Sequence, residues 1–595
     1  MTLTKDRKAS ARQASWLTSP LTLLAAALVL VALLLSVPLW LPVGPMYWDV
    51  MIYYDAANRI FDGQVPINDF FAPVGPIGYY LFAGWLAVFP DAHPTLIAHW
   101  SLLAITAPLM ALVVWEIDRR SRVTAFGVLI PFLIFALLPF NTHDFYPFPG
   151  SDGFGIYNRQ CCQLLYVLVA ALVFVRDQRV LGFIVAASML SLFFLKITGF
   201  VAALIVCLFG FVAGRLHLRA AILSAVAFFV VLGAAQAWNG IVTHYIDDIV
   251  ALASKNDETI LPRFLQAASI NFGVVLTIGL LILVLGWAER RKIARRWAEA
   301  RSARRIGAFA RVLDVDALWL AVVLFAGIAF ETQNTGSQAM IFLWPVVLAI
   351  LLRATSLMAT PKLMIATVVL ALAAILPIGV NTIERAARTY VGGLKNERMP
   401  NGNLKQLGAL TMRSDVLRRS NNMIAFYGAH QNEFEDLVRV GELPTPVLYS
   451  DFDFQVVHLM AIDRAIASIR KLEAKKDIRF DTIMSLNFVN PLPYLMDRSA
   501  PKHIAIGADP SRAVPRPGDS VTKAVEGTDL VLYPTCPLTT ANAHLYEIYA
   551  PMLSKHLRIH LDECYDAFVH PRFAEKLAAT QPDSFASVSA KSLPL

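Results

Sequence analysis

The sequence predicts an α-helical polytopic membrane protein with a C-terminal soluble α/β domain. Of its 595 residues, 56% are hydrophobic and only 16% are charged, and the mean hydropathy is +0.55. These values lie well outside those of soluble globular domains. Long apolar runs recur through residues 20–380, whereas residues 381–595 are mostly polar and alternate short β-like runs with helix-like stretches.

The apolar runs predict about eleven transmembrane helices. The first, Leu21 to Leu41, follows a basic start and is too long for the core of a cleavable signal peptide. Residues 76–90 are also apolar, but we expect an interfacial or half-inserted helix there. The remaining runs, each long enough to cross a bilayer with some tilt, are 94–115, 123–140, 160–175, 180–195, 198–213, 219–237, 267–287, 317–330, 339–352 and 363–380.

The loop charges predict the orientation of the chain. Nearly all loop Lys and Arg fall in 116–122, 176–179, 214–219 and 289–311, which become cytoplasmic if residues 1–19 are cytoplasmic. Residues 381–595 are then exported, and a multi-pass protein of the bacterial inner membrane is expected. The net charge of +8 is therefore a topology signal, and no nucleic-acid partner is expected.

Residues 381–595 predict a soluble α/β domain of about 200 residues. Strands are expected at 445–450, 503–507 and 529–534, and a helix from Gln455 to Glu473. Cys536 and Cys564 are the only cysteines of this region, where oxidation would be permitted, so a disulfide between them is an open possibility.

The first outer loop, residues 43–76, concentrates acidic residues directly after the first apolar run. Asp49, Asp55 and Asp69 are the candidate catalytic residues, because ionisable groups at the membrane edge are costly and often mark a reaction site. Residues 50–62 have the spacing of an amphipathic helix on the membrane surface. Simpler roles stay open: Asp49 as a helix N-cap, Asp55 with Arg59 as a solvated ion pair, and Asp69 as a turn cap.

Two further outer loops and one short junction supply the other candidates. Lys196, Arg159 and Arg59 are candidates for binding a phosphate at the membrane surface, although a lone Lys such as Lys196 is also typical of a snorkelling anchor. The candidate substrate-loop residues are polar or aromatic side chains of 141–159 and 331–338, namely His143, Asp144, Tyr157, Asn158, Glu331, Gln333 and Asn334.

This pattern resembles the GT-C superfamily of multi-pass glycosyltransferases, which take a sugar from a polyprenyl-phosphate carrier. The matching elements are the first span, the acidic motif Tyr47-Trp48-Asp49, the interfacial helix, and a G-x-x-P-x-x-D-F…P-x-G-P…Y segment from Gly63 to Tyr79. The last element is similar to the corresponding region of protein O-mannosyltransferases and lipid A aminoarabinose transferases. The likeness covers residues 20–380 in architecture and 47–80 in motif.

The resemblance implies a membrane glycosyltransferase with Asp49 as general base on the acceptor. Its donor would be a polyprenyl-phosphate sugar, and its acceptor a glycan, lipid or protein of the cell envelope. One displacement at the anomeric carbon would make hexosyl or pentosyl transfer inverting. Many relatives carry an Asp-Glu pair where this chain has Asp49-Val50, so the second carboxylate falls to Asp55 or Asp69. A divalent metal ion stays open as a cofactor, and its ligands are unassigned.

Two interpretations from other classes compete. A transporter or flippase of lipid-linked glycans would place ionisable residues or Gly and Pro breaks near the middle of its spans, whereas the polar residues here gather at one face. A membrane-anchored envelope assembly scaffold would recognise its partners through residues 381–595. The clustering at one face favours surface chemistry.

Overall fold

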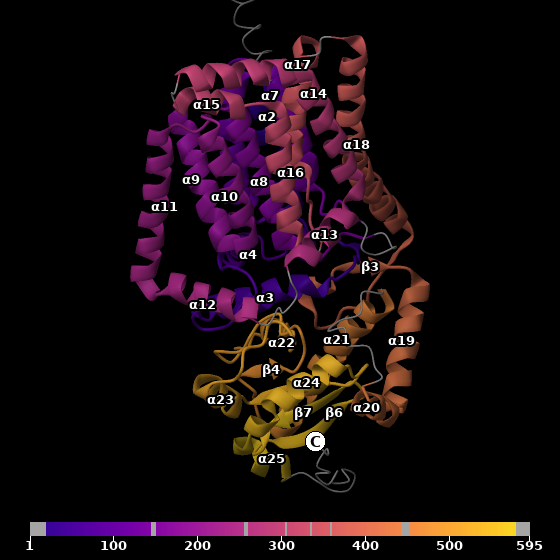
Figure 1. The fold of residues 1–595 in the computed structure, drawn as a ribbon. Coiled ribbons are helices and arrows are strands. Elements are labelled where there is room, and N and C mark those ends of the chain that lie inside the picture. The colour runs from indigo at the N-terminus through magenta and orange to yellow at the C-terminus, as the bar shows by residue number, and fades with distance from the viewer. Residues whose placement is uncertain are drawn as a thin grey trace, which may run out of the picture.

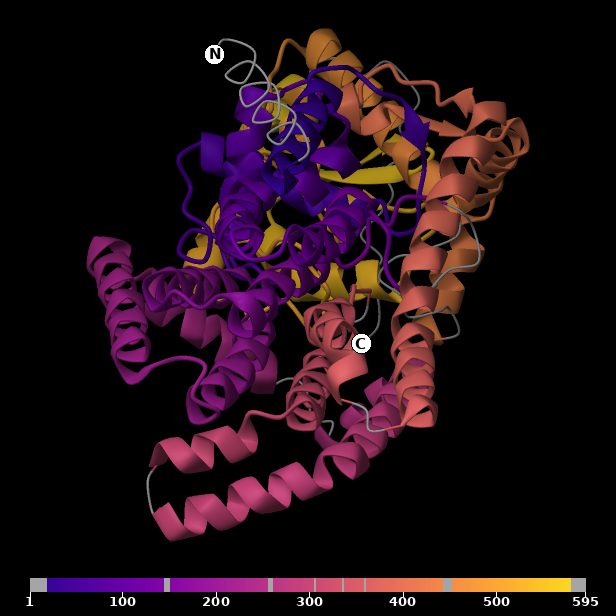
Figure 2. The ribbon, with the colours of Figure 1, turned by 90° about the horizontal axis from the view of Figure 1, so that it is seen from above.

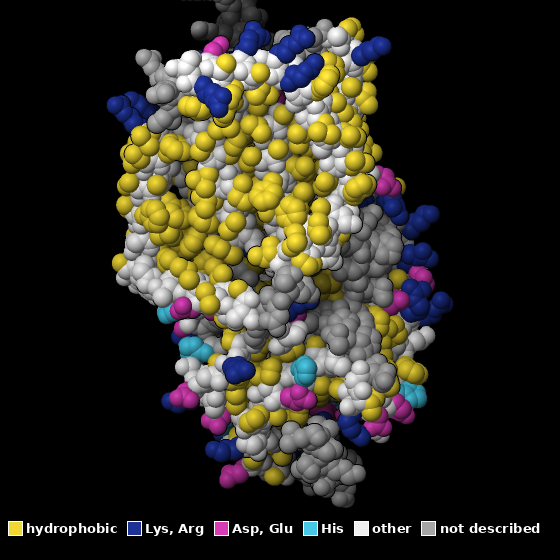
Figure 3. Space-filling model, viewed as in Figure 1, with side chains coloured by type: hydrophobic (Ala, Val, Ile, Leu, Met, Phe, Trp, Pro, Cys, Tyr) yellow, Lys and Arg dark blue, Asp and Glu magenta, His cyan; other side chains and the backbone are white. Residues whose placement is uncertain are grey.

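The computed structural model describes residues 19–143, 150–254, 260–303, 306–333, 336–357, 360–441 and 452–578. A helical bundle forms one part, and a mixed region of helices and short strands is attached to one end of it (Figure 1). We call this end of the bundle the sheet-proximal end. The opposite end holds the start of the first described helix and the basic residues of 289–311 (Figures 1 and 3).

Helices occupy each of the eleven predicted apolar runs. The helices of the bundle are α2 (Pro20–Leu35), α5 (Pro94–Trp100), α6 (Leu103–Asp118), α7 (Arg122–Leu137), α8 (Ile156–Phe174), α9 (Gln178–Leu195), α10 (Ile197–Val212), α11 (Leu218–Asn239), α14 (Phe272–Ala303), α16 (Asp316–Glu331), α17 (Trp344–Leu357) and α18 (Pro361–Gly392). Shorter helices between them are α3 (Trp48–Phe61), α4 (Ile77–Val88), α12 (Ile241–Ser254), α13 (Ile260–Ile270) and α15 (Ile306–Leu313).

The chain is a multi-pass membrane protein. Within the described ranges, five helices are long and apolar enough to cross a bilayer, and the bent pair α5 and α6 makes up to six. Five shorter apolar helices, α2 and α10 among them, accompany these. Large apolar side chains of α11 such as Phe229 and Trp238 are 67% and 71% exposed, and apolar side chains cover the middle of the bundle surface (Figure 3). Exposed apolar side chains of this kind are favourable in contact with lipid and unfavourable in contact with water.

The first predicted span is shorter than expected. Helix α2 ends at Leu35 rather than continuing to Leu41, because Pro38 cannot continue a helix and disfavours a helical residue before it. The chain instead extends into β1 (Leu41–Pro42), which pairs with β3 (Leu410–Met412), and β3 pairs with β2 (Glu397–Arg398). This small sheet ties the first loop to the chain beyond α18.

Helix α18 crosses the predicted boundary between residues 380 and 381. Its apolar first part belongs to the bundle, and its second part, which is richer in charged residues, ends at Gly392. Seen from above, the later part of α14 projects from the bundle beside α15, and this part carries the basic segment (Figure 2). Helix α4 has 12 residues and so spans about 18 Å, less than the roughly 30 Å of a hydrocarbon core, which agrees with a helix that does not cross fully.

A four-stranded sheet with the order β4-β5-β7-β6 lies in the C-terminal region. Its strands are β4 (Ile483–Ser485), β5 (Leu530–Pro534), β6 (Leu557–Asp562) and β7 (Tyr565–Val569), with β4 and β5 parallel and the other pairs antiparallel. The surrounding helices are α19 (Ser414–Ala429), α20 (Gln431–Arg439), α21 (Phe452–Lys476), α22 (Leu492–Met496), α23 (Asp519–Glu526), α24 (Thr540–Tyr549) and α25 (Ala574–Ala578).

The two faces of this sheet are both covered by helices. Leu530 and Leu532 belong to the core that includes α21, whereas Val531 and Tyr533 pack in a second core with Leu545 of α24. This alternation follows from the period of two in a strand. The predicted strand at 529–534 and the predicted helix from 455 are confirmed as β5 and α21.

The two other predicted strands are not confirmed. The run 445–450 lies outside the described residues. The prediction for 503–507 is wrong, because the backbone there pairs with the first loop: the N–H of His503 donates to the carbonyl of Asp69, and that of Ile506 to Phe71. The open possibility of a disulfide is confirmed, since Cys536 and Cys564 are bonded, while Cys161, Cys162 and Cys207 are free and buried.

Candidate active site

Helix α3 lies between the bundle and the C-terminal region, which bonds to it at both ends. At its start, the N–H of Tyr47 donates to Oε1 of Gln455 on α21 at 2.8 Å. Further along, Nδ2 of Asn58 donates to the carbonyl of Arg498 at 3.0 Å. The apolar side packs on α4, where Tyr53 and Tyr54 contact Phe82. Both faces of this helix are therefore buried, and the prediction of a solvated polar face is wrong.

Asp49 sits in the first turn of α3 and faces the bundle. It is not the N-cap, which is Tyr47. Its side chain is 8% exposed. Burial raises the pKa of Asp49 to about 7, and the backbone N–H of Gly155 and the charge of Arg159 oppose this rise. A carboxyl group with such a pKa can accept a proton near neutral pH.

Arg159 is held in a buried network at the start of α8. Its Nη1 donates to Oδ1 of Asn141 at 2.6 Å, and its Nη2 donates to the carbonyl of Asp152 at 2.7 Å. The same Nη2 lies 2.8 Å from Nε2 of His99. With 1% exposure, this guanidinium shapes the loop beside Asp49 and contributes positive charge there.

Arg385 of α18 completes this network from a distant part of the sequence. Its Nη2 lies 3.2 Å from Oδ2 of Asp152, and its Nη1 donates to the carbonyl of Asn141 at 2.8 Å. Asp152 also accepts from the N–H of Asn141 at 2.7 Å. Burial raises the pKa of Asp152, while Arg385 and then Arg159 oppose the rise. The loop that ends at Gly155 is therefore fixed by two buried arginines.

The backbone around Gly155 leaves no room for a side chain. Gly155 has φ of +70°, and a Cβ there would lie 1.7 Å from the carbonyl oxygen of Gly336. A Cβ on Gly44 would likewise meet the backbone of Ser151 at 1.8 Å. Glycine is required where backbones approach this closely. Three segments, 43–49, 150–159 and 336–338, consequently meet around Asp49.

Lys196 connects α9 and α10 at the same end. Its Nζ donates to Oδ1 of Asn158 at 3.0 Å and to the carbonyl of Gln333 at 3.5 Å. The ammonium also lies 4.6 Å from the centre of the Tyr157 ring. Tyr157 in turn interacts electrostatically with Asp49. Lys196 and Asp49 therefore both lie near Tyr157.

Arg59 and Asp55 form a buried pair elsewhere on α3. Nε of Arg59 lies 2.8 Å from Oδ1 of Asp55, with side chains 1% and 3% exposed. Nη1 of Arg59 also donates to the carbonyl of Pro501 at 2.8 Å. The i, i+4 ion pair predicted from sequence is present, but it is buried under the C-terminal region rather than solvated.

Asp69 closes the turn at the end of the first loop. Its Oδ2 accepts from the N–H of Val65 at 2.8 Å, as the turn-cap interpretation expects, and its Oδ1 lies 3.3 Å from Nζ of Lys502. The structure thus brings Asp49 together with Arg159, Tyr157 and Lys196, and places Asp55, Arg59 and Asp69 in contact with the C-terminal region.

The remaining predicted residues line the neighbouring loops. Glu331 is hydrogen-bonded to Ser337, and Oε1 of Gln333 accepts from Nη1 of Arg263 at 2.8 Å. His143 bonds Oδ1 of Asn271 at 2.9 Å. Asp144 and Asn334 lie outside the described residues. Among described side chains, no group of three or more His, Cys, Asp or Glu is arranged to hold a metal ion.

Sequence reasoning did not select His99, Asn141, Asp152 or Arg385. Arg385 could have been noticed in the sequence, since it is a basic residue on the continuation of an apolar helix. Its partner Asp152 lies 233 positions away, and the sequence alone does not connect the two. Asp152 stands in a polar loop among aromatic residues, where its type alone does not separate a structural role from a catalytic one.

Comparisons with known proteins identify neighbours in structure only. No family model matches the chain, and no curated protein matches it. The chain is similar in structure to two solved structures of ArnT. These are crystal structures of ArnT from Cupriavidus metallidurans in the apo state and bound to undecaprenyl phosphate, with 13% and 14% identity and TM-scores of 0.38 and 0.39. The alignments cover 94% and 92% of this chain and 98% and 97% of ArnT, an aminoarabinose transferase of the GT-C family.

Replacing Arg385 with Ala should destabilise the protein. The change leaves the Asp152 carboxylate buried with one of its two cationic neighbours gone, and breaking a buried pair in this way typically costs about 3–5 kcal/mol. Unfolding of the purified protein in detergent, followed by near-UV circular dichroism, measures the loss. Arg388→Ala, which removes an exposed partner of Glu384 on the same helix, should cost less than about 1 kcal/mol. Equal effects of the two substitutions would contradict a structural role for the buried network.

Proposed function

We propose that this protein is a membrane glycosyltransferase that moves a sugar from a polyprenyl-phosphate carrier to an acceptor in the cell envelope. The observation that carries the proposal is that Asp49, a buried carboxylate with a pKa of about 7, and the Lys196 ammonium both lie near Tyr157. A base and a cation near a common ring at the membrane edge suit the displacement of a lipid phosphate by a hydroxyl group.

In the proposed reaction, Asp49 takes the proton of the acceptor hydroxyl as its oxygen attacks the anomeric carbon. The bond between this carbon and the phosphate oxygen breaks, and the electron pair leaves with the polyprenyl phosphate. Lys196 stabilises the negative charge that develops on the phosphate. A single displacement of this kind inverts the anomeric centre, for a hexosyl or a pentosyl group alike.

Among the candidates, Asp49 and Lys196 suit these roles better than the others. Asp55 and Arg59 neutralise each other and hold the C-terminal region, and Asp69 caps a turn. Arg159 donates to Asn141 and Asp152, so we assign it to positioning the loop and to electrostatic support of Asp49. Undecaprenyl phosphate, the ligand in one ArnT structure, is the class of carrier that we propose here.

We also propose the orientation that the sequence predicts. Residues 1–19 and the basic segment 289–311 would face the cytoplasm, the eleven apolar segments would cross the inner membrane, and the α/β region from 381 would face outward with the site. The charge distribution over the bundle supports this arrangement, because Lys and Arg gather at the end opposite the C-terminal region (Figure 3). The network of Asp152, Arg159 and Arg385 lies beside Asp49 at the sheet-proximal end, which supports surface chemistry over transport.

Asp49→Asn should abolish the transfer. A general base contributes about 100-fold to 10,000-fold to a rate, and the amide keeps the size of the side chain without accepting the proton. Mass spectrometry of envelope glycans from cells that lack the protein, complemented with wild type or variant at equal membrane abundance, measures the result. Asp62→Asn, at the exposed end of the same helix, should restore the missing sugar as wild type does. Restoration by Asp49→Asn would refute Asp49 as the base.

The rate of transfer should depend on pH through Asp49. Because its pKa is raised to about 7, the ionised base predominates only above this pH. We expect kcat/KM to fall about tenfold per pH unit below 7 and to level off above it. Initial rates of the purified protein in nanodiscs between pH 5 and 9 test this. The residual rate of Asp49→Asn should lack this dependence, and a flat wild-type profile down to pH 5 would contradict the assignment.

Lys196→Ala should weaken use of the lipid donor. Loss of one charge-assisted contact of about 1.5–3 kcal/mol corresponds to a rise in donor KM of about tenfold to 100-fold. Steady-state kinetics with varied polyprenyl-phosphate sugar measures it. Lys502→Ala removes an exposed lysine at the same end of the bundle and should leave donor KM unchanged. The same KM for Lys196→Ala and wild type would remove Lys196 from the carrier site.

A further inference from the structure

A cavity lies between the start of α3 and the C-terminal region. It has about 460 Å³ between atoms, counted with the solvent at its mouth. Trp48 forms its α3 side, and His458 of α21 faces it from the C-terminal region. Asn487, Thr539 and Asn542 supply further polar groups. Trp48 directly precedes the proposed base.

The lining of this cavity is polar but uncharged. It contains amide, hydroxyl, imidazole and indole groups together with aromatic and proline rings, and none of the described residues that line it is Asp, Glu, Lys or Arg. Burial lowers the pKa of His458 to about 4, so the imidazole is neutral at physiological pH. A site without formal charge discriminates against phosphates and carboxylates, because it cannot replace their hydration.

Two ring nitrogens at the cavity are buried without a hydrogen-bond partner among the described residues. They are Nε1 of Trp48, whose side chain is 2% exposed, and Nε2 of His458. The two rings are nearly perpendicular, with centroids 6.1 Å apart. A buried polar atom without a partner costs about 1–3 kcal/mol. A ligand that hydrogen-bonds to these atoms would recover that free energy.

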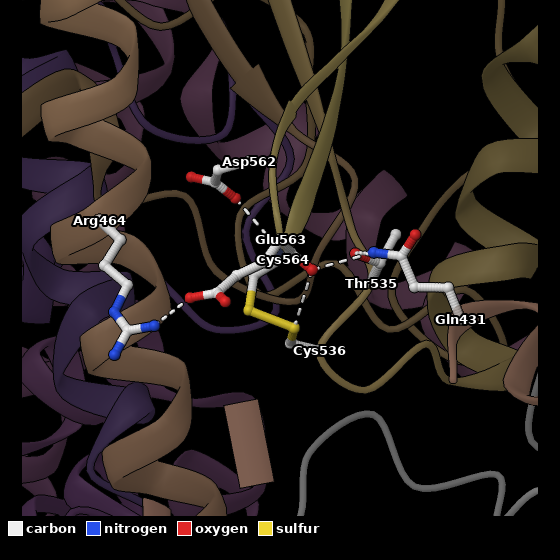
Figure 4. The surroundings of a disulfide bond; sticks show 7 residues. All are labelled: Gln431, Arg464, Thr535, Cys536, Asp562, Glu563 and Cys564. Carbon is white, nitrogen blue, oxygen red and sulfur yellow. Dashed lines mark hydrogen bonds and ion pairs between the residues drawn. A yellow bond between two sulfur atoms is a disulfide. The ribbon is translucent and has the colours of Figure 1, made fainter. Parts of the chain in front are cut away.

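The far wall of the cavity is rigid. The Cys536–Cys564 disulfide contributes to it and joins the end of β5 to the turn before β7 (Figure 4). Nε2 of Gln431 donates to Oγ1 of Thr535 at 3.2 Å and to the carbonyl of Glu563 at 2.9 Å, and Arg464 of α21 pairs with Glu563 (Figure 4). A preformed wall binds its ligand without first losing conformational freedom.

We infer that this cavity binds a neutral sugar unit of the acceptor, and this inference rests on the proposed transferase function. Sugar hydroxyl groups donate and accept, as indole, neutral imidazole and amide groups require, and their C–H faces pack on aromatic rings. Asp49 does not line the cavity. The bound unit is therefore one remote from the reacting hydroxyl, and it selects an acceptor that is itself a neutral glycan.

Saturation-transfer difference NMR on the full chain in nanodiscs tests this inference without requiring transfer. The probes are the methyl glycosides of glucose, galactose and mannose, with glucuronate as the anionic comparison. With the wild-type protein, a saturation-transfer signal should appear for at least one neutral glycoside and not for glucuronate. The signal should fall at least threefold in Trp48→Phe and in His458→Phe, which keep an aromatic ring but remove the nitrogens. His544→Phe, an exposed position on α24, should match wild type.

The outcomes separate the two proposals. Unchanged signals in both cavity variants, or no neutral glycoside bound by wild type, would overturn the inference even if the enzyme transfers sugar. Binding by a wild type that never transfers sugar would refute the proposed function instead. With an active enzyme, the two variants should raise acceptor KM about tenfold and leave donor KM unchanged. If the Trp48→Phe variant does not fold, the His458→Phe variant, whose substitution lies outside α3, is sufficient to test the inference.

Discussion

The burial of helix α3 between bundle and C-terminal region is the constraint on which the rest of the structure depends. A helix with Asp55, Asn58 and Arg59 on one face cannot lose water unless every polar group finds a partner. The C-terminal region provides these partners as backbone carbonyls of 498–501 and the side chain of Gln455. The membrane part and the C-terminal region therefore both contact this helix and bury it between them.

The same constraint explains which parts could be predicted from the sequence. Apolar runs determine helices by themselves, because lipid requires every backbone group to be satisfied within the segment. Helices consequently occupy all predicted runs, and only ends set by local residues, such as Pro38 after α2, were misjudged. The amphipathic spacing of 50–62 predicted a helix correctly. It did not predict burial on both sides, since the second covering surface comes from residues more than 400 positions later.

The sequence predicts which residues belong to the site, but it does not predict how they are arranged in space. Asp49, Lys196, Tyr157 and Asn158 were selected for their position next to apolar runs, and the structure places them near one another. Arg59 and Arg159 have the same residue type as a phosphate ligand, yet both are engaged by buried partners. Only the fold shows which partners each cation has, because these contacts join segments that are distant in the sequence.

The first turn of α3 also separates the two substrates that we propose. Successive residues of a helix point about 100° apart, so Trp48 and Asp49 cannot face the same space. Asp49 faces Gly155 and Arg159 in the bundle, and Trp48 faces His458 in the C-terminal region. In the proposed reaction, the helix start would present Asp49 on the side of the bundle and an uncharged binding surface on the side of the C-terminal region. An acceptor that reaches both sides of the first turn of α3 would present its hydroxyl group to Asp49 only when its next sugar unit occupies the cavity. Recognition of the acceptor and proton transfer would then be coupled through two adjacent residues, Trp48 and Asp49.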